Sequence, residues 1–150
     1  MPPEVDKGYE PNPKPSARVA SSVVFVSDLS RSVAFYRDVF GCELTVQETT
    51  AALMLAPGGF QLYLMGVGAE TQHPSGGVGV QYLMWATDSA DDLRRFEAAL
   101  RRRGCYADTH EEDGVSFVEG HDPDGIRVVI ANPGPDQLPR RSLDARLYGW

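Results

Sequence analysis

Residues 21–44, "SSVVFVSDLSRSVAFYRDVFGCEL", indicate the fold most clearly. An apolar run leads into Asp28, a turn that contains serine, an amphipathic segment and then Gly-Cys. Residues 80–107, "VQYLMWATDSADDLRRFEAALRRRGCYA", repeat this order, with Asp88 in the place of Asp28. The chain therefore contains two copies of one unit, and each copy predicts a strand followed by a helix.

Apolar residues recur at helical spacing in both segments and predict one buried stripe per helix. They are Val33, Tyr36 and Phe40 in the first helix and Leu93, Phe96 and Leu100 in the second. Ser30 and Ser89 are the expected N-caps, because a serine hydroxyl can accept a hydrogen bond from the first turn. Asp92 follows Ser89 at the spacing of a capping box.

Three short strands are expected after each helix, separated by turns rich in Gly, Pro and Asp. They cover about residues 43–48, 51–55 and 60–65 in the first copy, and 105–110, 115–119 and 126–131 in the second. The last strand follows the turn "HDPDG", residues 121–125. The order is thus βαβββ twice, which predicts an α+β domain over residues 18–132 with modules at about 19–66 and 79–132.

The two ends of the chain fall outside the repeat. Residues 1–17 contain five prolines and predict a flexible arm. Residues 133–150 form a C-terminal tail with large apolar residues, and a patch of such residues is rarely left exposed to water. These residues are Leu143, Leu147, Tyr148 and Trp150. We expect the tail to pack on this subunit or on a partner, and Trp150 as a lid over a pocket is the alternative.

Composition excludes several classes of function. The 150 residues carry a net charge of −7, which would repel nucleic-acid phosphates. No apolar run approaches the roughly 20 residues of a membrane span. The N-terminus has no apolar signal-like segment, and Cys42 and Cys105 lack metal-type spacing. The expectation is a cytoplasmic protein with no membrane or nucleic-acid partner.

The tandem βαβββ repeat, the segment "FVSDLSRSVAFYRDVFGCEL" and the final "DPDGIRVVI" together resemble the vicinal oxygen chelate superfamily. That family includes glyoxalase I, extradiol dioxygenases, fosfomycin-resistance proteins and bleomycin-binding proteins. The resemblance covers about residues 19–132. It implies that the modules form an open, incomplete barrel with the helices outside and the site on its concave face.

The resemblance also places four metal-ligand positions in this chain, and here they are Ser21, Tyr63, Gln81 and Val129. A transition-metal site needs three or four His, Cys or carboxylate donors. Serine is a weak neutral ligand, the amide of glutamine suits calcium better than zinc or iron, and valine offers no donor. We therefore expect no metal and no other cofactor.

Strand alternation extends these positions into a candidate pocket wall. The expected ligand-binding residues are Ser21, Phe25, Gln61, Tyr63, Gln81, Trp85, Arg127 and Val129. Their strand neighbours, Tyr82 and Met84 among them, are expected to lie under the helices instead. Aromatic walls with a few polar groups are typical of a ligand pocket. The alternative is that the aromatic side chains simply fill the barrel.

Catalytic candidates are few. Glu119 and His121 are close in sequence, and a histidine beside a carboxylate can act as a general base. Asp122 is the other acidic neighbour, and we expect it to cap the DPDG turn. His110 lies beside a predicted hairpin and is expected to be exposed.

Two functional hypotheses follow from these observations, beside a third, supported only by the two tails, that the domain is kept for protein interaction. The first is a metal-free protein that binds a planar or aromatic small molecule, similar to bleomycin-resistance proteins. The second is a superfamily enzyme, a lyase, isomerase or dioxygenase, with a non-standard or absent metal site. A homodimer is expected in either case, because open sheets leave edges that need cover and the superfamily usually pairs. The C-terminal tail is the candidate for part of that interface.

Overall fold

The computed structural model describes residues 17–68, 77–141 and 145–147, so all but the last residue of the predicted arm lies outside the described residues. The elements are β1 (Ser21–Val26), α1 (Leu29–Phe40), β2 (Glu43–Gln47), β3 (Ala51–Leu55), β4 (Gln61–Gly66), β5 (Leu83–Ala86), α2 (Ala90–Arg102), β6 (Tyr106–Glu112), β7 (Val115–His121), β8 (Arg127–Asn132) and the short 3₁₀ helix η1 (Ala145–Leu147). Each predicted strand after a helix is present, with bounds that differ by a few residues at most.

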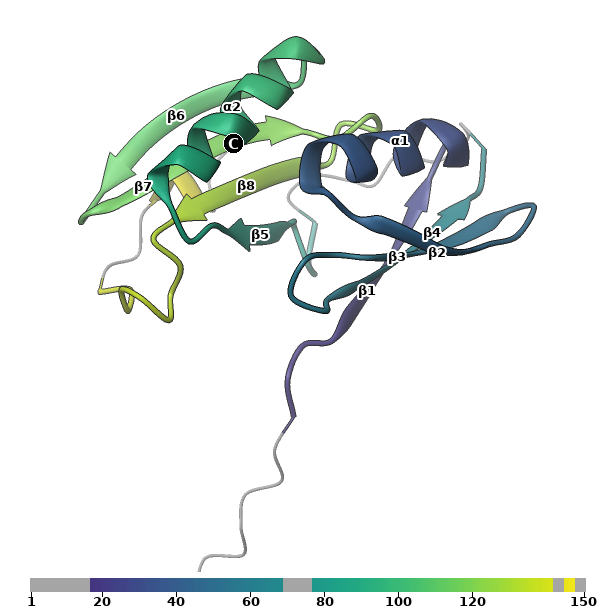
Figure 1. Cartoon of the computed structure of the whole chain (residues 1–150), viewed down its shortest axis with the longest axis horizontal. Coiled ribbons are helices and arrows are strands. Elements are labelled where there is room, and N and C mark those ends of the chain that lie inside the picture. The colour runs from purple at the N-terminus through teal and green to yellow at the C-terminus, as the bar shows by residue number, and fades with distance from the viewer. Residues whose placement is uncertain (1–16, 69–76, 142–144, 148–150) are drawn as a thin grey trace, which may run out of the picture.

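Each module forms its own four-stranded sheet. The strand orders are β1-β4-β3-β2 and β5-β8-β7-β6. The first strand of each module pairs in parallel with the last, and the other pairs are antiparallel. Among the described residues the two sheets do not close into a barrel (Figure 1). The predicted α+β class with tandem βαβββ modules is confirmed.

The helices lie on one side of both sheets and share a core (Figure 1). From the sheets, Val26, Leu62, Leu64, Val128 and Ile130 join this core, as alternation predicted for strands that are covered on one face. Phe40 of α1 stacks on Trp85 of β5 at 4.1 Å between ring centroids and lies 5.4 Å from Phe96 of α2. The end of α1 therefore packs against the second module. None of the described helices has the length and apolarity that crossing a membrane requires.

The start of α1 differs from the prediction. Asp28, not Ser30, is the N-cap, because Asp28 has extended backbone and its carboxylate accepts a hydrogen bond from the Arg31 amide at 3.1 Å. Ser89 caps α2 as predicted and accepts from the Asp92 amide. The structural equivalent of Asp28 is therefore Ser89, one residue after Asp88.

Both helices end at the repeated Gly-Cys pair. Gly41 and Gly104 have positive φ values of 67° and 68°, which a residue with a side chain adopts at a cost. The amides of Cys42 and Cys105 then bond back to the carbonyls of Tyr36 and Leu100. Both cysteines are buried and unpaired. The Gly-Cys repeat thus turns the chain out of each helix and returns it to the core.

The DPDG turn joins the two modules. Asp124 accepts hydrogen bonds from the amide and hydroxyl of Ser27, and Arg31 lies 3.3 Å from the same carboxylate. Asp122 accepts from the Asp124 amide at 2.9 Å, which confirms the predicted capping of this turn, and from the Tyr36 hydroxyl at 2.9 Å. The turn that opens β8 is therefore fixed against the start of α1.

Candidate functional site

A cavity of about 610 Å³ lies between the modules, where the edge strands β1 and β5 face each other. Its wall is mostly apolar and contains Ser22, Val23, Val24, Phe25, Tyr36, Val67, Val80, Gln81, Tyr82, Leu83, Trp85, Ile126, Arg127 and Val128. The size and the mixture of aromatic walls with a few polar groups are typical of a small-molecule site. Both modules contribute, so the site depends on how they pack.

Four of the eight predicted ligand-binding residues line this cavity: Phe25, Gln81, Trp85 and Arg127. Phe25 is 62% exposed although it is a large apolar side chain. A ligand that stacked on Phe25 would remove its ring from water, which is favourable.

The predicted faces of β5 are wrong. Trp85 pairs with Ile130 and Leu83 with Val128, so their side chains lie on the helix side, where Trp85 stacks on Phe40. Tyr82 contacts the other face, with Val129. The error came from equating Asp88 with Asp28. When the N-caps are aligned instead, Tyr82 replaces Gln81 as the equivalent of Ser21.

Gln81 has a structural partner. Its side-chain amide donates to the carbonyls of Gly77 and Gly79, at 2.6 and 2.9 Å. The amide therefore holds the end of the linker that enters the second module. Gln81 borders the cavity, but this nitrogen is engaged with the backbone.

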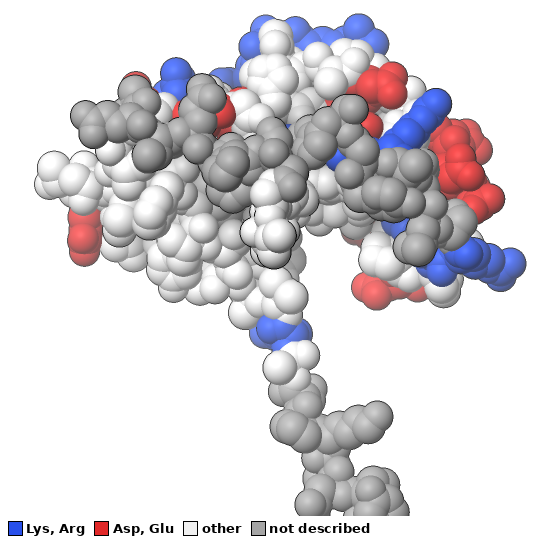
Figure 2. Space-filling view, turned by 180° about the vertical axis from the view of Figure 1, so that it is seen from behind, with Lys and Arg blue, Asp and Glu red and all other residues white. Residues whose placement is uncertain are grey.

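Three other predicted residues lie together outside the cavity lining. Ser21 pairs with Gln61, and Tyr63 is 40% exposed on the same face of β4. We call this surface of the first sheet, away from α1, the N-terminal helix-free face; its exposed apolar residues are Val23, Phe25, Val46, Tyr63 and Met65. Figure 2 shows a broad surface with few charged side chains over this module.

Val129, the eighth predicted residue, is fully buried on the corresponding face of the second sheet. Val115, Phe117 and Ala131 lie around it. The C-terminal segment covers them, because Leu138 and Leu147 pack against this cluster. Part of the tail therefore packs on its own subunit, one of the two alternatives from the sequence. Leu143, Tyr148 and Trp150 lie outside the described residues.

The four metal positions of the family do not fit a metal in this chain. With the alignment corrected they hold Ser21, Tyr63, Tyr82 and Val129. Tyr63 donates to Gln61, Tyr82 donates to the carbonyl of Leu147, and Val129 has no donor atom. None of the four is the His, Cys or carboxylate that such a site needs.

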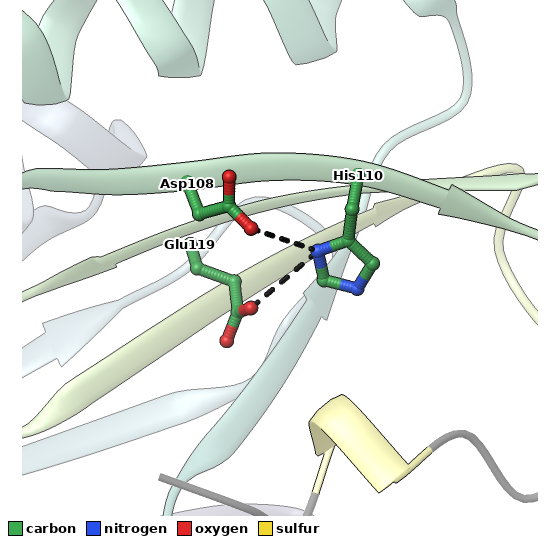
Figure 3. A group of neighbouring side chains, drawn as sticks. All are labelled: Asp108, His110 and Glu119. Atoms are coloured by element: carbon green, nitrogen blue, oxygen red, sulfur yellow. Dashed lines mark ion pairs between the residues drawn. The ribbon is translucent and has the colours of Figure 1, made fainter.

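A cluster of polar side chains lies on the second sheet, where Asp108, His110 and Glu119 meet (Figure 3). The Nδ1 atom of His110 is 3.5 Å from a carboxylate oxygen of Glu119 and 3.6 Å from one of Asp108. Arg127 donates to the other oxygen of Glu119 through Nε, at 2.6 Å, and through Nη2. A metal ion bound to Glu119 would lie beside this guanidinium, which opposes binding of a cation.

The structure corrects two predictions about histidines. His110 is only 8% exposed, not exposed, and its ring stacks on Phe117 at 5.1 Å. His121 is exposed, and its Nδ1 lies 3.2 Å from the Asp122 carbonyl. The histidine beside Glu119 is thus His110 on the paired strand. The alternation of His110 with Asp108 along β6 was the signal that the sequence offered. Only the register between β6 and β7 shows that Glu119 lies opposite Asp108.

Tyr36 and Asp122 form a buried pair at another point of the cavity wall. Burial and the nearby Asp122 raise the pKa of Tyr36 well above its usual range. Burial also raises the pKa of Asp122, while hydrogen bonds from Ile126, Tyr36 and Asp124 partly offset that effect. Tyr36 therefore stays a hydroxyl donor to Asp122, and this polar contact fixes the wall.

Comparison with known proteins identifies the family to which this architecture belongs. The family model described as Glyoxalase/Bleomycin resistance protein/Dioxygenase superfamily matches residues 18–130. No curated protein matches the chain.

Solved structures share the fold at low sequence identity. A glyoxylase/bleomycin resistance protein/dioxygenase domain from Frankia sp. EAN1pec is 22% identical, covers 77% of this chain and 97% of its own, and has a TM-score of 0.69. Lactoylglutathione lyase from Agrobacterium tumefaciens is 23% identical, with 79% and 95% covered and a TM-score of 0.62. A fosfomycin resistance protein from Listeria monocytogenes is 12% identical, with 77% and 93% covered and a TM-score of 0.64.

Proposed function

Because the chain belongs to the Glyoxalase/Bleomycin resistance protein/Dioxygenase superfamily, we propose that it binds a planar or aromatic small molecule in the cavity between β1 and β5, without a metal at the family's four ligand positions. The observation that carries the proposal is the cavity itself. It is large enough for a ligand of two or three fused rings, and its wall is mostly apolar. Arg127 and Tyr82 supply polar groups that would orient the ligand.

The test is the affinity of planar aromatic probes for the protein and for Phe25→Ala, measured by isothermal titration calorimetry. Stacking on an aromatic ring is worth about 0.5–1.5 kcal/mol beyond area burial, so Phe25→Ala is expected to weaken binding about 2- to 13-fold. Phe25 is exposed, so its removal leaves the core intact.

Val46→Ala is the matched control, because Val46 is also exposed on the N-terminal helix-free face but does not line the cavity. Its affinity is expected to equal that of the unmodified protein. Equal weakening by the two substitutions, or none by either, would contradict binding in this cavity.

Metal content tests the second part of the proposal. Protein purified without chelators is expected to contain less than about 0.1 equivalent of zinc, nickel, iron or manganese, because the four positions offer no strong donors. Mass spectrometry of the digested protein measures this directly. A stoichiometric transition metal that remained after exchange into buffer would overturn the metal-free reading.

One observation favours a superfamily enzyme as a second candidate. His110 is buried and two carboxylates face its Nδ1 atom, and a histidine beside carboxylates can act as a general base toward a bound molecule. Incubation of the protein with each probe that binds, followed by mass spectrometry for product, separates the candidates. Turnover that is lost in His110→Gln, with binding retained, would favour the enzyme.

A further inference from the structure

We propose that Arg127 and Tyr82 form a carboxylate-binding subsite at the cavity wall, and that the C-terminal segment occupies it with main-chain carbonyls until a ligand carboxylate displaces them. This inference rests on the proposed function, because it assigns a chemical class to the ligand of the same cavity. It adds a competitor within the chain, which the proposed function does not require.

The geometry of Arg127 carries the proposal. One edge of the guanidinium, Nε and Nη2, faces Glu119. The other edge faces the C-terminal segment: Nη1 donates to the Leu147 carbonyl at 3.2 Å, and Nη2 donates to the Arg146 carbonyl. Two adjacent carbonyl oxygens thus occupy the fork that binds the two oxygens of a carboxylate in a bidentate pair.

Tyr82 adds a third donor. Its hydroxyl donates to the same Leu147 carbonyl that Arg127 binds, so a side chain just before β5 and one from β8 converge on one oxygen. The Tyr82 ring also lies 4.7 Å from the guanidinium carbon of Arg127. Glu119 and this ring hold the guanidinium in place, and a site that is already ordered binds at a lower entropic cost.

A ligand carboxylate is expected to bind Arg127 and Tyr82 more strongly than the main-chain carbonyls do. A carboxylate carries a full charge opposite to that of the guanidinium, which a carbonyl oxygen does not, and it gives the neutral Tyr82 hydroxyl an ionised acceptor. The segment that would leave is short, since η1 has three residues and Leu147 is only partly buried. Both donors also line the cavity, so an aromatic ligand in the cavity could present its carboxylate to them.

The test compares 2-naphthoate with 2-naphthamide, which has the same rings and no charge. Calorimetry is expected to show 2-naphthoate binding about tenfold more tightly. Tyr82→Phe should remove most of that preference while 2-naphthamide binds as before. Tyr63→Phe is the matched control, because its hydroxyl lies on the other sheet, and should change neither affinity.

Leu147→Ser tests the competition. It removes an apolar contact of the C-terminal segment and leaves both donors intact, so 2-naphthoate should bind several-fold more tightly while 2-naphthamide changes less. Trypsin cleavage after Arg146 in the unmodified protein should also accelerate when 2-naphthoate is added.

The outcomes separate the two proposals. Equal affinities for both probes, unaffected by Tyr82→Phe, would overturn the subsite and leave the proposed function standing. A preference for 2-naphthoate without any effect of Leu147→Ser or on Arg146 cleavage would overturn the competition. Binding of neither probe to any of these proteins would overturn the subsite together with the proposed function.

Discussion

The hydroxyl of Tyr36 links α1 to the carboxylate of Asp122 at the DPDG turn. Asp122 is 1% exposed, so its carboxylate depends on protein donors rather than on water. The same tyrosine borders the cavity between the modules. A change at this atom therefore affects both stability and the shape of the site.

Tyr36→Phe is expected to lower the free energy of unfolding by about 1.5–3 kcal/mol, because it removes a buried hydrogen bond to a charged group. Chemical denaturation measures the change. Tyr106→Phe is the control, since the Tyr106 hydroxyl contacts Thr109 at an exposed position and its loss should cost less than about 0.5 kcal/mol. Equal costs for the two variants would show that the Tyr36–Asp122 contact is not special.

The raised pKa of Asp122 predicts how stability depends on pH. The folded protein holds the Asp122 proton more tightly than the unfolded chain, whose ordinary value is 3.8. This group therefore favours folding most below pH 3.8, and its contribution is lost as the pH rises through the folded pKa. Carbon NMR titration of the Asp122 carboxyl should show a midpoint above 3.8, moving higher still in Tyr36→Phe. A midpoint below 3.8 would contradict the assigned cause, which is burial.

Among the elements, β5 shows why some predictions from the sequence succeeded and others failed. The helices and the strands after them follow from apolar periodicity, and turn residues mark their ends. β5 is different, because Tyr82 and Met84 on one face are as apolar as Leu83 and Trp85 on the other. Periodicity could not choose between the faces, and pairing Asp28 with Asp88 chose the wrong one. Only the register with β8 settles it.

The polar group around Glu119 was missed for a related reason. Its members come from β6, β7 and β8, and β6 carries an irregularity between Tyr106 and Asp108 that shifts the pairing. A sequence gives the alternation within a strand but not the partner across it. His110 was therefore predicted from its position near a hairpin, and its burial depended on residues elsewhere in the chain.

The β5 register makes a testable prediction about two adjacent residues. Trp85→Ala removes the ring that stacks on Phe40 and is expected to cost about 3 kcal/mol of unfolding free energy. Met84→Ala is the matched control, because Met84 is 44% exposed on the opposite face and should cost less than about 1 kcal/mol. Denaturation of both variants measures the difference. A larger loss of stability in Met84→Ala than in Trp85→Ala would instead support the strand faces predicted from the sequence.

At the scale of the whole molecule, the helix-free faces of the two sheets differ. The C-terminal segment packs on the second, and the apolar residues of the first are exposed in the single chain. Contiguous exposed apolar surface commonly marks an interface between proteins. We therefore propose that the part of the N-terminal helix-free face outside the cavity wall, around Tyr63 and Met65, forms the homodimer contact rather than the tail.

Met65→Glu is expected to convert the dimer to a monomer, because it places a charge on this face. Analytical ultracentrifugation measures the mass, and circular dichroism checks the fold. Val19→Glu is the control, since Val19 is exposed but precedes β1. A folded Met65→Glu protein that stayed dimeric with unchanged dimer affinity would show that the interface lies elsewhere.

The proposed function requires that the cavity between β1 and β5 binds a planar aromatic ligand without a metal. The most direct measurement is a backbone amide NMR titration of chelator-treated protein with 2-naphthamide and 2-naphthoate. Saturable shift changes are expected to be largest at residues 23–25 and 80–83, on the two sides of the cavity. Changes that appeared only after metal was added, or that centred on β2 and β3 away from the cavity, would contradict the proposed function.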